Sequence, residues 1–282
     1  MMKSNSIGSA LKGVVKDLHT PRLAYDYGLP RLTWELTTGP RHTVVISAKT
    51  GVGKTAFALQ VALSMARSGR NVAYLSLEMA ADQLAERLLA RAGTMAAIRH
   101  RDATQTQEQA MRQQMEELRK LPIDLVEAPG ITVADIADYI RKHPTVDVII
   151  VDYVQLMGGE AANAYEAQTN ISKALATLAK DTAKCIIVLA QENLKGDHND
   201  DDMGNIQGTA QYEQDADAII SLCLEKRGDY KSRRVLKVKK NRHGDPGMRL
   251  YLDYDGNMMM FTESEDQEPR STSSTQKFDF KK

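Results

Sequence analysis

The chain has little cysteine, few aromatic residues and no net charge. Cysteine occurs twice in 282 residues, at Cys185 and Cys223, both inside apolar runs. Two such residues provide neither a disulfide framework nor the spacing of a zinc site, so we expect reduced core cysteines. The 37 basic residues balance the 37 acidic ones. Any affinity for nucleic acid must therefore come from local patches and not from overall charge.

Long hydrophobic runs are absent as well. No stretch approaches the ~20 apolar residues that cross a bilayer, and no signal peptide opens the chain. The six histidines show no pair at ligand spacing, which argues against a metal cluster. These absences predict a soluble cytoplasmic protein with no membrane partner. The length suits one large α/β domain or two small ones.

The most informative stretch is a glycine-bearing turn between an apolar run and a helical pattern. Residues 44–46 are apolar, residues 48–55 read Ala-Lys-Thr-Gly-Val-Gly-Lys-Thr, and an apolar helical pattern follows. Backbone N–H groups of such a turn, with the N-terminus of the next helix, cradle a polyphosphate. Lys54 then reaches the outer phosphates, and the Thr55 hydroxyl is placed to hold Mg²⁺. The residues predicted to contact the nucleotide here are Ala48, Gly51, Val52, Gly53, Lys54 and Thr55.

From Thr43 onward, short apolar runs alternate with helical patterns, which predicts a parallel α/β sheet. After residue 216 the apolar runs follow one another without helices, as in an antiparallel extension of the sheet. We expect strands at 43–47, 72–76, 123–126, 147–151, 185–190, 217–224, 233–239, 248–254 and 257–261. We expect helices at 54–67, 81–92, 104–119, 132–142 and 167–180, with Thr132 as an N-cap.

Three further strand ends carry polar residues that suit a nucleotide site. Asp152 ends a buried strand about a hundred residues after the glycine turn, where P-loop enzymes hold Mg²⁺ through water. Glu78 follows another strand, and the residue type fits equally a base that polarises water or a helix-capping acid. Gln191 follows a third strand, where an amide can sense a γ-phosphate or be an ordinary surface residue.

A basic run, a short N-terminal helix and a polar tail remain. Lys240 and Arg242 belong to a run that is either a solvated strand face or, in a ring of ATPases, a source of arginine fingers. Residues 1–20 form an amphipathic helical pattern that packs on its own domain or on a neighbouring subunit. Residues 262–282 have few apolar residues and are expected to be disordered, leaving residues 21–261 as the folded domain.

With these residues in view, the chain resembles the C-terminal ATPase domain of DnaB-type replicative DNA helicases over roughly residues 21–261. The resemblance rests on Ser-Leu-Glu-Met at residues 76–79, Asp-Tyr-Val-Gln-Leu-Met at 152–157, and Lys-Asn-Arg-His-Gly at 240–244, together with the P-loop. Any one motif alone would be weak. The set in this order is specific.

The resemblance implies a RecA-like P-loop NTPase core, a mostly parallel twisted sheet flanked by helices. It further implies a ring, expected to be hexameric, that hydrolyses ATP with Mg²⁺ between subunits and translocates on single-stranded DNA to unwind duplex during replication. By matching position, Glu78 is the catalytic base and Gln191 the γ-phosphate sensor. Lys240 and Arg242 reach across from the neighbour, and residues 1–20 correspond to the linker helix that docks there. Gln207, Gly208 and Thr209 fall in the second DNA-binding loop.

Some positions depart from the family pattern. The second DNA loop lacks its usual arginine, and we expect no counterpart of the family's N-terminal domain, which normally helps form the ring, as in a helicase of phage or plasmid type. A helicase loader and a primase are the further partners that the resemblance suggests. Two alternatives remain. One is a RecA-like ATPase for recombination or packaging, and the other is a nucleotide-binding accessory subunit of a host helicase ring.

Overall fold

The computed structural model describes residues 6–8, 11, 25–159, 161–192 and 211–267. These residues contain one nine-stranded sheet in the order β3-β2-β4-β5-β1-β6-β7-β8-β9. The strands are β1 (Thr43–Ala48), β2 (Val72–Ser76), β3 (Ile123–Glu127), β4 (Val148–Asp152), β5 (Cys185–Gln191), β6 (Ala218–Leu224), β7 (Arg234–Asn241), β8 (Arg249–Asp255) and β9 (Met260–Glu263).

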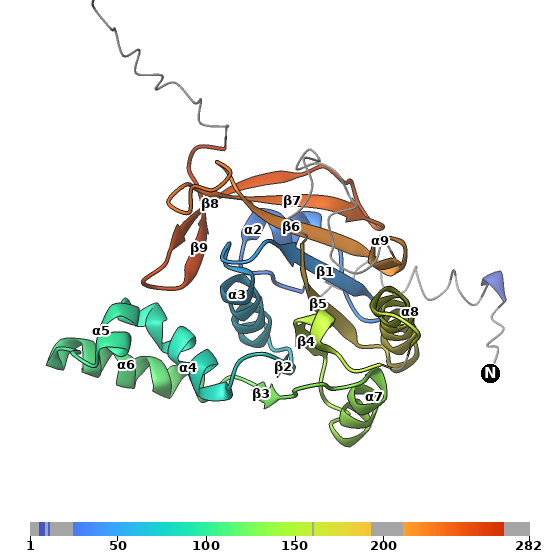
Figure 1. Cartoon of the computed structure of the whole chain (residues 1–282), viewed down its shortest axis with the longest axis horizontal. Helices are drawn as coiled ribbons and strands as arrows, with labels where there is room; N and C mark the ends of the chain where they lie inside the picture. The colour runs from blue at the N-terminus through green and yellow to red at the C-terminus, as the bar shows by residue number, and fades with distance from the viewer. Residues whose placement is uncertain (1–5, 9–10, 12–24, 160, 193–210, 268–282) are drawn as a thin grey trace, which may run out of the picture.

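Parallel pairing runs from β3 to β6, and antiparallel pairing from β6 to β9. The predicted parallel core with an antiparallel C-terminal extension is confirmed (Figure 1). Each expected strand is present, with ends displaced by a few residues at most, the usual uncertainty of helix and strand boundaries. In the part of the chain that the structure describes, no helix is long and apolar enough to cross a membrane.

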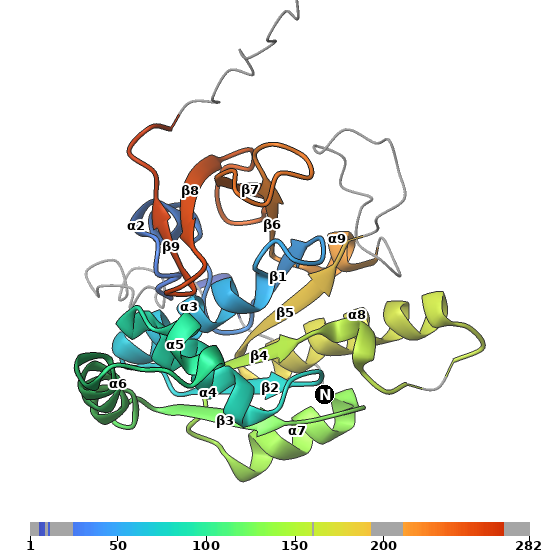
Figure 2. The same cartoon turned by 60° about the vertical axis from the view of Figure 1, so that its left-hand side comes forward.

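Helices cover both faces of the sheet. They are α2 (Pro30–Glu35), α3 (Lys54–Arg67), α4 (Ala81–Leu89), α5 (Met95–His100), α6 (Gln105–Leu118), α7 (Val133–Lys142), α8 (Ala164–Thr182) and α9 (Gln211–Asp215), with 3-10 turns η1 (Ala90–Ala92) and η2 (Val154–Leu156). Helix α3 lies against one face, and α7 and α8 lie against the other (Figures 1 and 2). Helices α4, α5 and α6 gather beyond the β3 end of the sheet (Figure 1).

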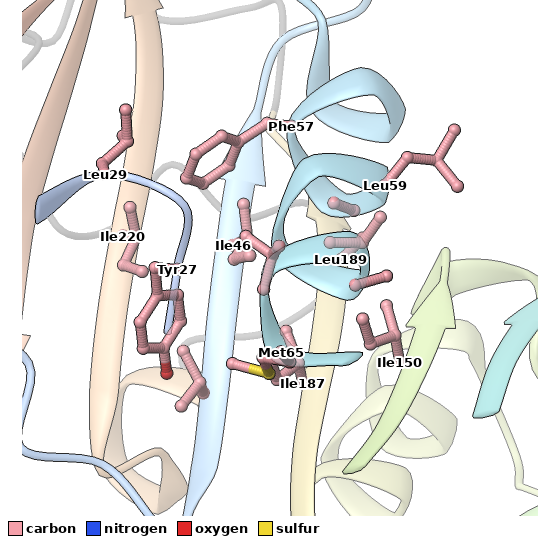
Figure 3. Packing of buried hydrophobic residues seen from close by; sticks show 14 of the residues in the cluster. Tyr27, Leu29, Ile46, Phe57, Leu59, Met65, Ile150, Ile187, Leu189 and Ile220 are labelled. Atoms are coloured by element: carbon pink, nitrogen blue, oxygen red, sulfur yellow. The ribbon is translucent and has the colours of Figure 1, made fainter. Parts of the chain in front are cut away.

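Two hydrophobic cores follow from the alternation of side chains along buried strands. In β1, Val44 and Ile46 belong to the core under α3, whereas Val45 belongs to the core under α7 and α8. Figure 3 shows the first core, where Phe57 and Met65 of α3 pack over Ile46. Because the central strands are covered on both sides, their carboxyl ends are held rigidly at one edge of the sheet.

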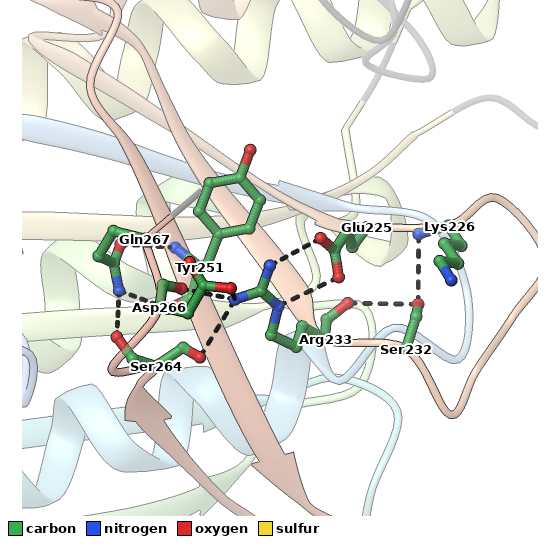
Figure 4. Close-up of polar contacts among 8 residues, drawn as sticks. All are labelled: Glu225, Lys226, Ser232, Arg233, Tyr251, Ser264, Asp266 and Gln267. Atoms are coloured by element: carbon green, nitrogen blue, oxygen red, sulfur yellow. Dashed lines mark hydrogen bonds and ion pairs between the residues drawn. The ribbon is translucent and has the colours of Figure 1, made fainter. Parts of the chain in front are cut away.

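The folded part extends past the boundary at residue 261 that the sequence suggested. Strand β9 continues to Glu263, and the backbone N–H of Tyr251 donates to Gln267 Oε1 at 3.1 Å. The Arg233 guanidinium donates to the backbone oxygen of Asp266 at 2.5 Å (Figure 4). The polar composition of residues 262–267 gave no sign of an ordered structure. These residues are ordered by contacts with Tyr251 and Arg233 and not by apolar residues of their own.

Three short helices were also missed by the sequence analysis, namely α2, α5 and α9. Each has five or six residues, too few for a clear helical period. Helix α8 begins at Ala164, three residues before the expected start at 167, because the Asn163 side chain accepts from the backbone N–H of Glu166. The expected N-cap at Thr132 is confirmed, since its side chain accepts from the backbone N–H of Asp135.

Candidate nucleotide site

The phosphate loop lies between β1 and α3, at the carboxyl edge of the parallel strands. Gly51 and Gly53 have φ values of 81° and 115°, which side chains disfavour. A Cβ on Gly53 would lie 2.8 Å from Cζ of Phe261, a ring that is itself fully buried. Backbone geometry and crowding therefore both require glycine at position 53.

The antiparallel extension supports this loop from behind. Arg234 of β7 donates from Nε to the backbone oxygen of Val52 at 3.1 Å. Tyr230, in the connection between β6 and β7, approaches the backbone oxygen of Thr50 at 3.5 Å. Val52 is buried on this rear side, so its part in the site is to fix the loop through its backbone. The loop is thus held in shape by the protein before any ligand arrives.

A pocket of about 530 Å³ opens in front of the loop. It contains most of the nucleotide-site residues predicted from the sequence. It is lined by Ala48, Lys49, Thr50, Gly51, Gly53, Lys54, Thr55, Ala56, Glu78, Met79, Gln83, Arg87, Tyr153, Gln191, Tyr254 and Met259.

The ammonium group of Lys54 lies in the pocket beside an aromatic ring. Its Nζ lies 4.5 Å from the centroid of the Tyr153 ring. Burial lowers the pKa of Lys54, and the negative charges of Asp152 and Glu78 act in the opposite direction. A bound polyphosphate would add negative charge beside the ammonium and favour its protonated form.

Asp152 is buried just behind the pocket, at the end of β4. Its Oδ2 accepts from the Tyr74 hydroxyl at 2.7 Å. Its Oδ1 is buried and has no hydrogen-bond partner among the described residues. A buried carboxylate oxygen without a partner is costly, and a water of a bound Mg²⁺ would satisfy it. The Thr55 hydroxyl lines the same pocket, so the residues present fit a magnesium ion held with the phosphates.

Glu78 follows β2 and is exposed within the pocket. Two contacts fix its turn. The backbone N–H of Leu77 donates to the backbone oxygen of Asp152 at 2.8 Å, and the Ser76 hydroxyl accepts from the backbone N–H of Met79 at 3.1 Å. The carboxylate faces the same pocket as Lys54, whose pKa burial lowers and the negative charge of Glu78 acts to raise.

Gln191 contacts the phosphate loop directly. Its Nε2 donates to the Thr50 hydroxyl at 2.8 Å. Its backbone is held on both sides by Gln155, which accepts from the N–H and donates to the carbonyl oxygen, each at 3.1 Å. An amide fixed in this way can respond to a group bound against the loop.

Lys240 and Arg242 lie outside this pocket. Lys240 Nζ donates to the backbone oxygens of Glu213 and Gln214 at 2.6 and 3.1 Å. Arg242 donates to Asp217 Oδ1 at 3.1 Å. Burial and the charge of Arg242 lower the pKa of Lys240.

These two cations are at the opposite edge of the sheet from the phosphate loop. Asn241 pairs with Ala218, which in turn pairs with Val44 near the start of β1. Four residue steps from Val44 to Ala48, at about 3.3 Å each, give roughly 13 Å to the start of the loop. Neither cation can therefore serve the nucleotide pocket of its own chain.

Some predicted residues cannot be placed, and some pocket residues had not been predicted. Gln207, Gly208 and Thr209 lie outside the described residues, as does most of the 1–20 segment. Tyr153 belongs to the quoted motif at residues 152–157, but no role in the pocket was predicted for it. The pocket residues that belong to no predicted motif are Gln83, Arg87, Tyr254 and Met259.

A glycine-bearing phosphate loop on a parallel sheet, with acidic residues on neighbouring strand ends, defines a P-loop nucleotide-binding domain of the RecA type. The chain belongs to the family described as the DnaB-like helicase C terminal domain, whose sequence profile matches residues 28–263.

Relatives agree with this assignment. The chain is 30% identical over 220 residues to the replicative DNA helicase DnaB of Geobacillus stearothermophilus, covering 72% of this chain and 48% of the relative. It is 30% identical over 211 residues to a probable plasmid replicative DNA helicase of Chlamydia trachomatis, covering 71% and 46%. The chain thus spans about half the length of the curated relatives it matches.

Solved structures share the fold. The ATPase domain of G40P superposes with a TM-score of 0.82 at 26% identity, covering 93% of this chain and all of that one. A DnaB-like replicative helicase, studied with its interactions with primase, gives a TM-score of 0.79 at 25% identity, covering 93% and 68%.

Proposed function

We propose that this chain is the ATP-hydrolysing motor of a replicative DNA helicase, assembled as a ring of identical subunits, expected to be hexameric, around single-stranded DNA. The observation that carries the proposal is the division of the site between two edges of the sheet. The phosphate loop, Glu78 and Gln191 meet in one pocket, while Lys240 and Arg242 are held at the far edge. Such a site is complete only when a second subunit supplies the cations.

Each residue then has a stated task. The loop amides and Lys54 bind the phosphates, and Thr55 and Asp152 would hold Mg²⁺. The ion, when bound, withdraws charge from the phosphoryl oxygens. Glu78 orients and polarises the attacking water, and Gln191 reads the γ-phosphate against Thr50. Arg242 of one subunit stabilises the charge that develops at the next subunit's site, aided by Lys240.

The remaining partners follow from the family. We place the DNA contact at Gln207, Gly208 and Thr209, in the segment that joins Glu192 to α9. We place residues 1–20 against the adjacent subunit as a linker helix. A primase and a loader are the expected protein partners. The names of bacterial and plasmid relatives support a bacterial cytoplasm as the place of action.

The decisive experiment measures ATP hydrolysis with and without single-stranded DNA, and then unwinding of a forked duplex. We expect DNA-stimulated hydrolysis and unwinding by the intact protein. Lys54→Ala should abolish both, whereas Lys142→Ala, which alters an exposed lysine of α7, should change neither. Hydrolysis without unwinding would favour the recombination or packaging reading. No hydrolysis by the intact protein under any DNA condition would refute the motor.

A further inference from the structure

A buried carboxylate, Glu192, lies directly after Gln191 and has no part in the mechanism above. Glu192 is only 4% exposed to solvent. Oε1 accepts from the Ser47 hydroxyl at 2.7 Å and from the Ser221 hydroxyl at 2.7 Å. Its backbone N–H donates to the carbonyl oxygen of Ala48 at 3.0 Å.

The register of the strands explains how one side chain reaches both serines. Ser47 of β1 pairs with Ala190 of β5 on one side and with Ser221 of β6 on the other. Paired residues of parallel strands share a face, and side chains alternate along a strand. Glu192 is two residues beyond Ala190 and so lies on that same face, reaching back to both hydroxyls. One oxygen thereby links the carboxyl ends of β5 and β1 to the middle of β6.

The same alternation places Gln191 on the other face. There its amide donates to Thr50 of the phosphate loop. Ser47, at the end of the Glu192 linkage, precedes the loop by a single residue, Ala48. The Glu192 linkage therefore fixes both the end of β5 that carries Gln191 and the end of β1 that carries the loop.

We infer that Glu192 is a positioning residue that sets the γ-phosphate sensor Gln191 at its working distance from the phosphate loop. This rests on the proposed function, because it takes Gln191 to contact the γ-phosphate. The carboxylate acts through Gln191 and touches no nucleotide itself. Its effect should therefore appear in the discrimination of triphosphate from diphosphate and not in nucleotide binding as such.

The test compares the affinities for a nonhydrolysable ATP analogue and for ADP, by titration calorimetry on the intact chain. Gln191→Ala should reduce the preference for the triphosphate on the order of tenfold, the range for a hydrogen bond to a charged group. Glu192→Ala should reduce it by a similar factor while leaving ADP affinity within about twofold. The double variant should be no worse than Gln191→Ala alone, because both act through one contact.

Two further variants separate positioning from plain stability. Glu192→Gln keeps an oxygen acceptor for Ser47 and Ser221 and should restore the preference. Ser221→Ala removes one of the two hydroxyl donors to Glu192 and should lower the preference for the triphosphate by a smaller factor. This variant tests the inference even if Glu192→Ala does not fold. Tyr139→Phe removes a hydroxyl bond to Asp124 away from the pocket and is the matched control.

The outcomes distinguish this inference from the function on which it rests. If Gln191→Ala lowers the preference but Glu192→Ala and Ser221→Ala do not, Glu192 has no positioning role and the sensor role of Gln191 still holds. Additive losses in the double variant, or an equal loss of ADP affinity, would also overturn the inference. If Gln191→Ala has no effect, the sensor assignment fails and the inference fails with it.

Discussion

At the scale of single residues, Gly53 of the phosphate loop meets two separate demands for glycine. Its φ of 115° is one, and the Phe261 ring 2.8 Å from a hypothetical Cβ is the other. Gly69, just after α3, has a φ of 83° and nothing within 4 Å of its hypothetical Cβ. Comparing alanine substitutions at Gly53 and Gly69 therefore separates the cost of backbone strain from the cost of crowding.

We expect Gly69→Ala to lower the free energy of unfolding by about 1 kcal/mol, the cost of placing a Cβ in the left-handed region. Gly53→Ala should cost about 2–4 kcal/mol, because overpacking against a buried ring adds to that strain. It should also weaken ATP binding, whereas Gly69→Ala should not. Urea denaturation and nucleotide titration measure the two effects. Equal losses of stability in both variants would contradict the crowding argument.

Tyr74 offers a second test at this scale. Its hydroxyl holds one oxygen of Asp152, which leaves the other for a water of Mg²⁺. Tyr74→Phe should raise the Mg²⁺ concentration for half-maximal hydrolysis by roughly 10-fold, as is usual when a residue that orients a metal ligand is lost. Tyr212→Phe removes a comparably buried hydroxyl bond, to Gln168 at 2.9 Å, away from the pocket. An equal shift in both variants would mean that general loosening, not Asp152, is responsible.

Much of the candidate site was predictable at this scale because its residues mark the ends of apolar strands or the glycine turn. Asp152 and Gln191 end apolar strands, and Lys54 closes the glycine-bearing turn that follows another. Glu192 did not stand out, because a glutamate after a strand gives no sign that two serines on other strands will turn toward it. Tyr254 and Arg87 enter the pocket from β8 and α4, and only the tertiary packing reveals them.

At the scale of elements, the antiparallel extension is held by a buried ion pair. Arg233 donates to both oxygens of Glu225, at 2.7 and 3.1 Å, with side chains 2% and 8% exposed (Figure 4). The hydrogen bonds to Glu225 raise the pKa of Arg233. The guanidinium also lies over the Tyr251 ring at 4.7 Å. One residue thus joins β7, β8 and the segment after β9.

Removing the arginine should leave a buried carboxylate without its partner. We expect Arg233→Ala to lower the free energy of unfolding by about 3 kcal/mol. Arg112 and Glu108 form the matched control, an exposed pair of α6 with side chains 72% and 54% exposed. Because solvent screens that pair, Arg112→Ala should cost at most about 0.5 kcal/mol. Similar midpoints in urea for the two variants would show that the Arg233 pair adds little to the fold.

The element scale also shows where sequence patterns stop being informative. The strands and long helices were predictable because their apolar residues repeat over many positions. Residues 264–267 were not, because they are ordered by Arg233, 31 or more positions away in the chain. Helix α9 has five residues and is held by contacts such as the one between Ser172 and Asp215 at 2.7 Å.

At the scale of the whole molecule, the sheet keeps its two sets of functional residues apart. The phosphate loop is at the carboxyl edge of β1, and Arg242 follows β7 at the amino edge. Because the sheet is buried on both faces, this separation cannot be closed by a small motion of one chain. In a ring, a head-to-tail arrangement brings the two edges of neighbouring subunits together at every interface.

That geometry predicts complementation between two inactive variants. Lys54→Ala should lose hydrolysis because it lacks the phosphate-binding cation. Arg242→Ala should lose it by about 10³-fold or more because it lacks the finger, while still binding nucleotide. When the two variants are mixed in equal amounts, some interfaces join an Arg242→Ala subunit to a following Lys54→Ala subunit. At such an interface the first subunit supplies Lys54 and the second supplies Arg242, so the site is intact. About a quarter of the sites should then hydrolyse ATP if subunits mix at random around a head-to-tail ring. Mixing Arg242→Ala with the double variant is the control, since no interface then has both groups. If the first mixture stays as inactive as this control although the subunits exchange, Arg242 does not act across an interface.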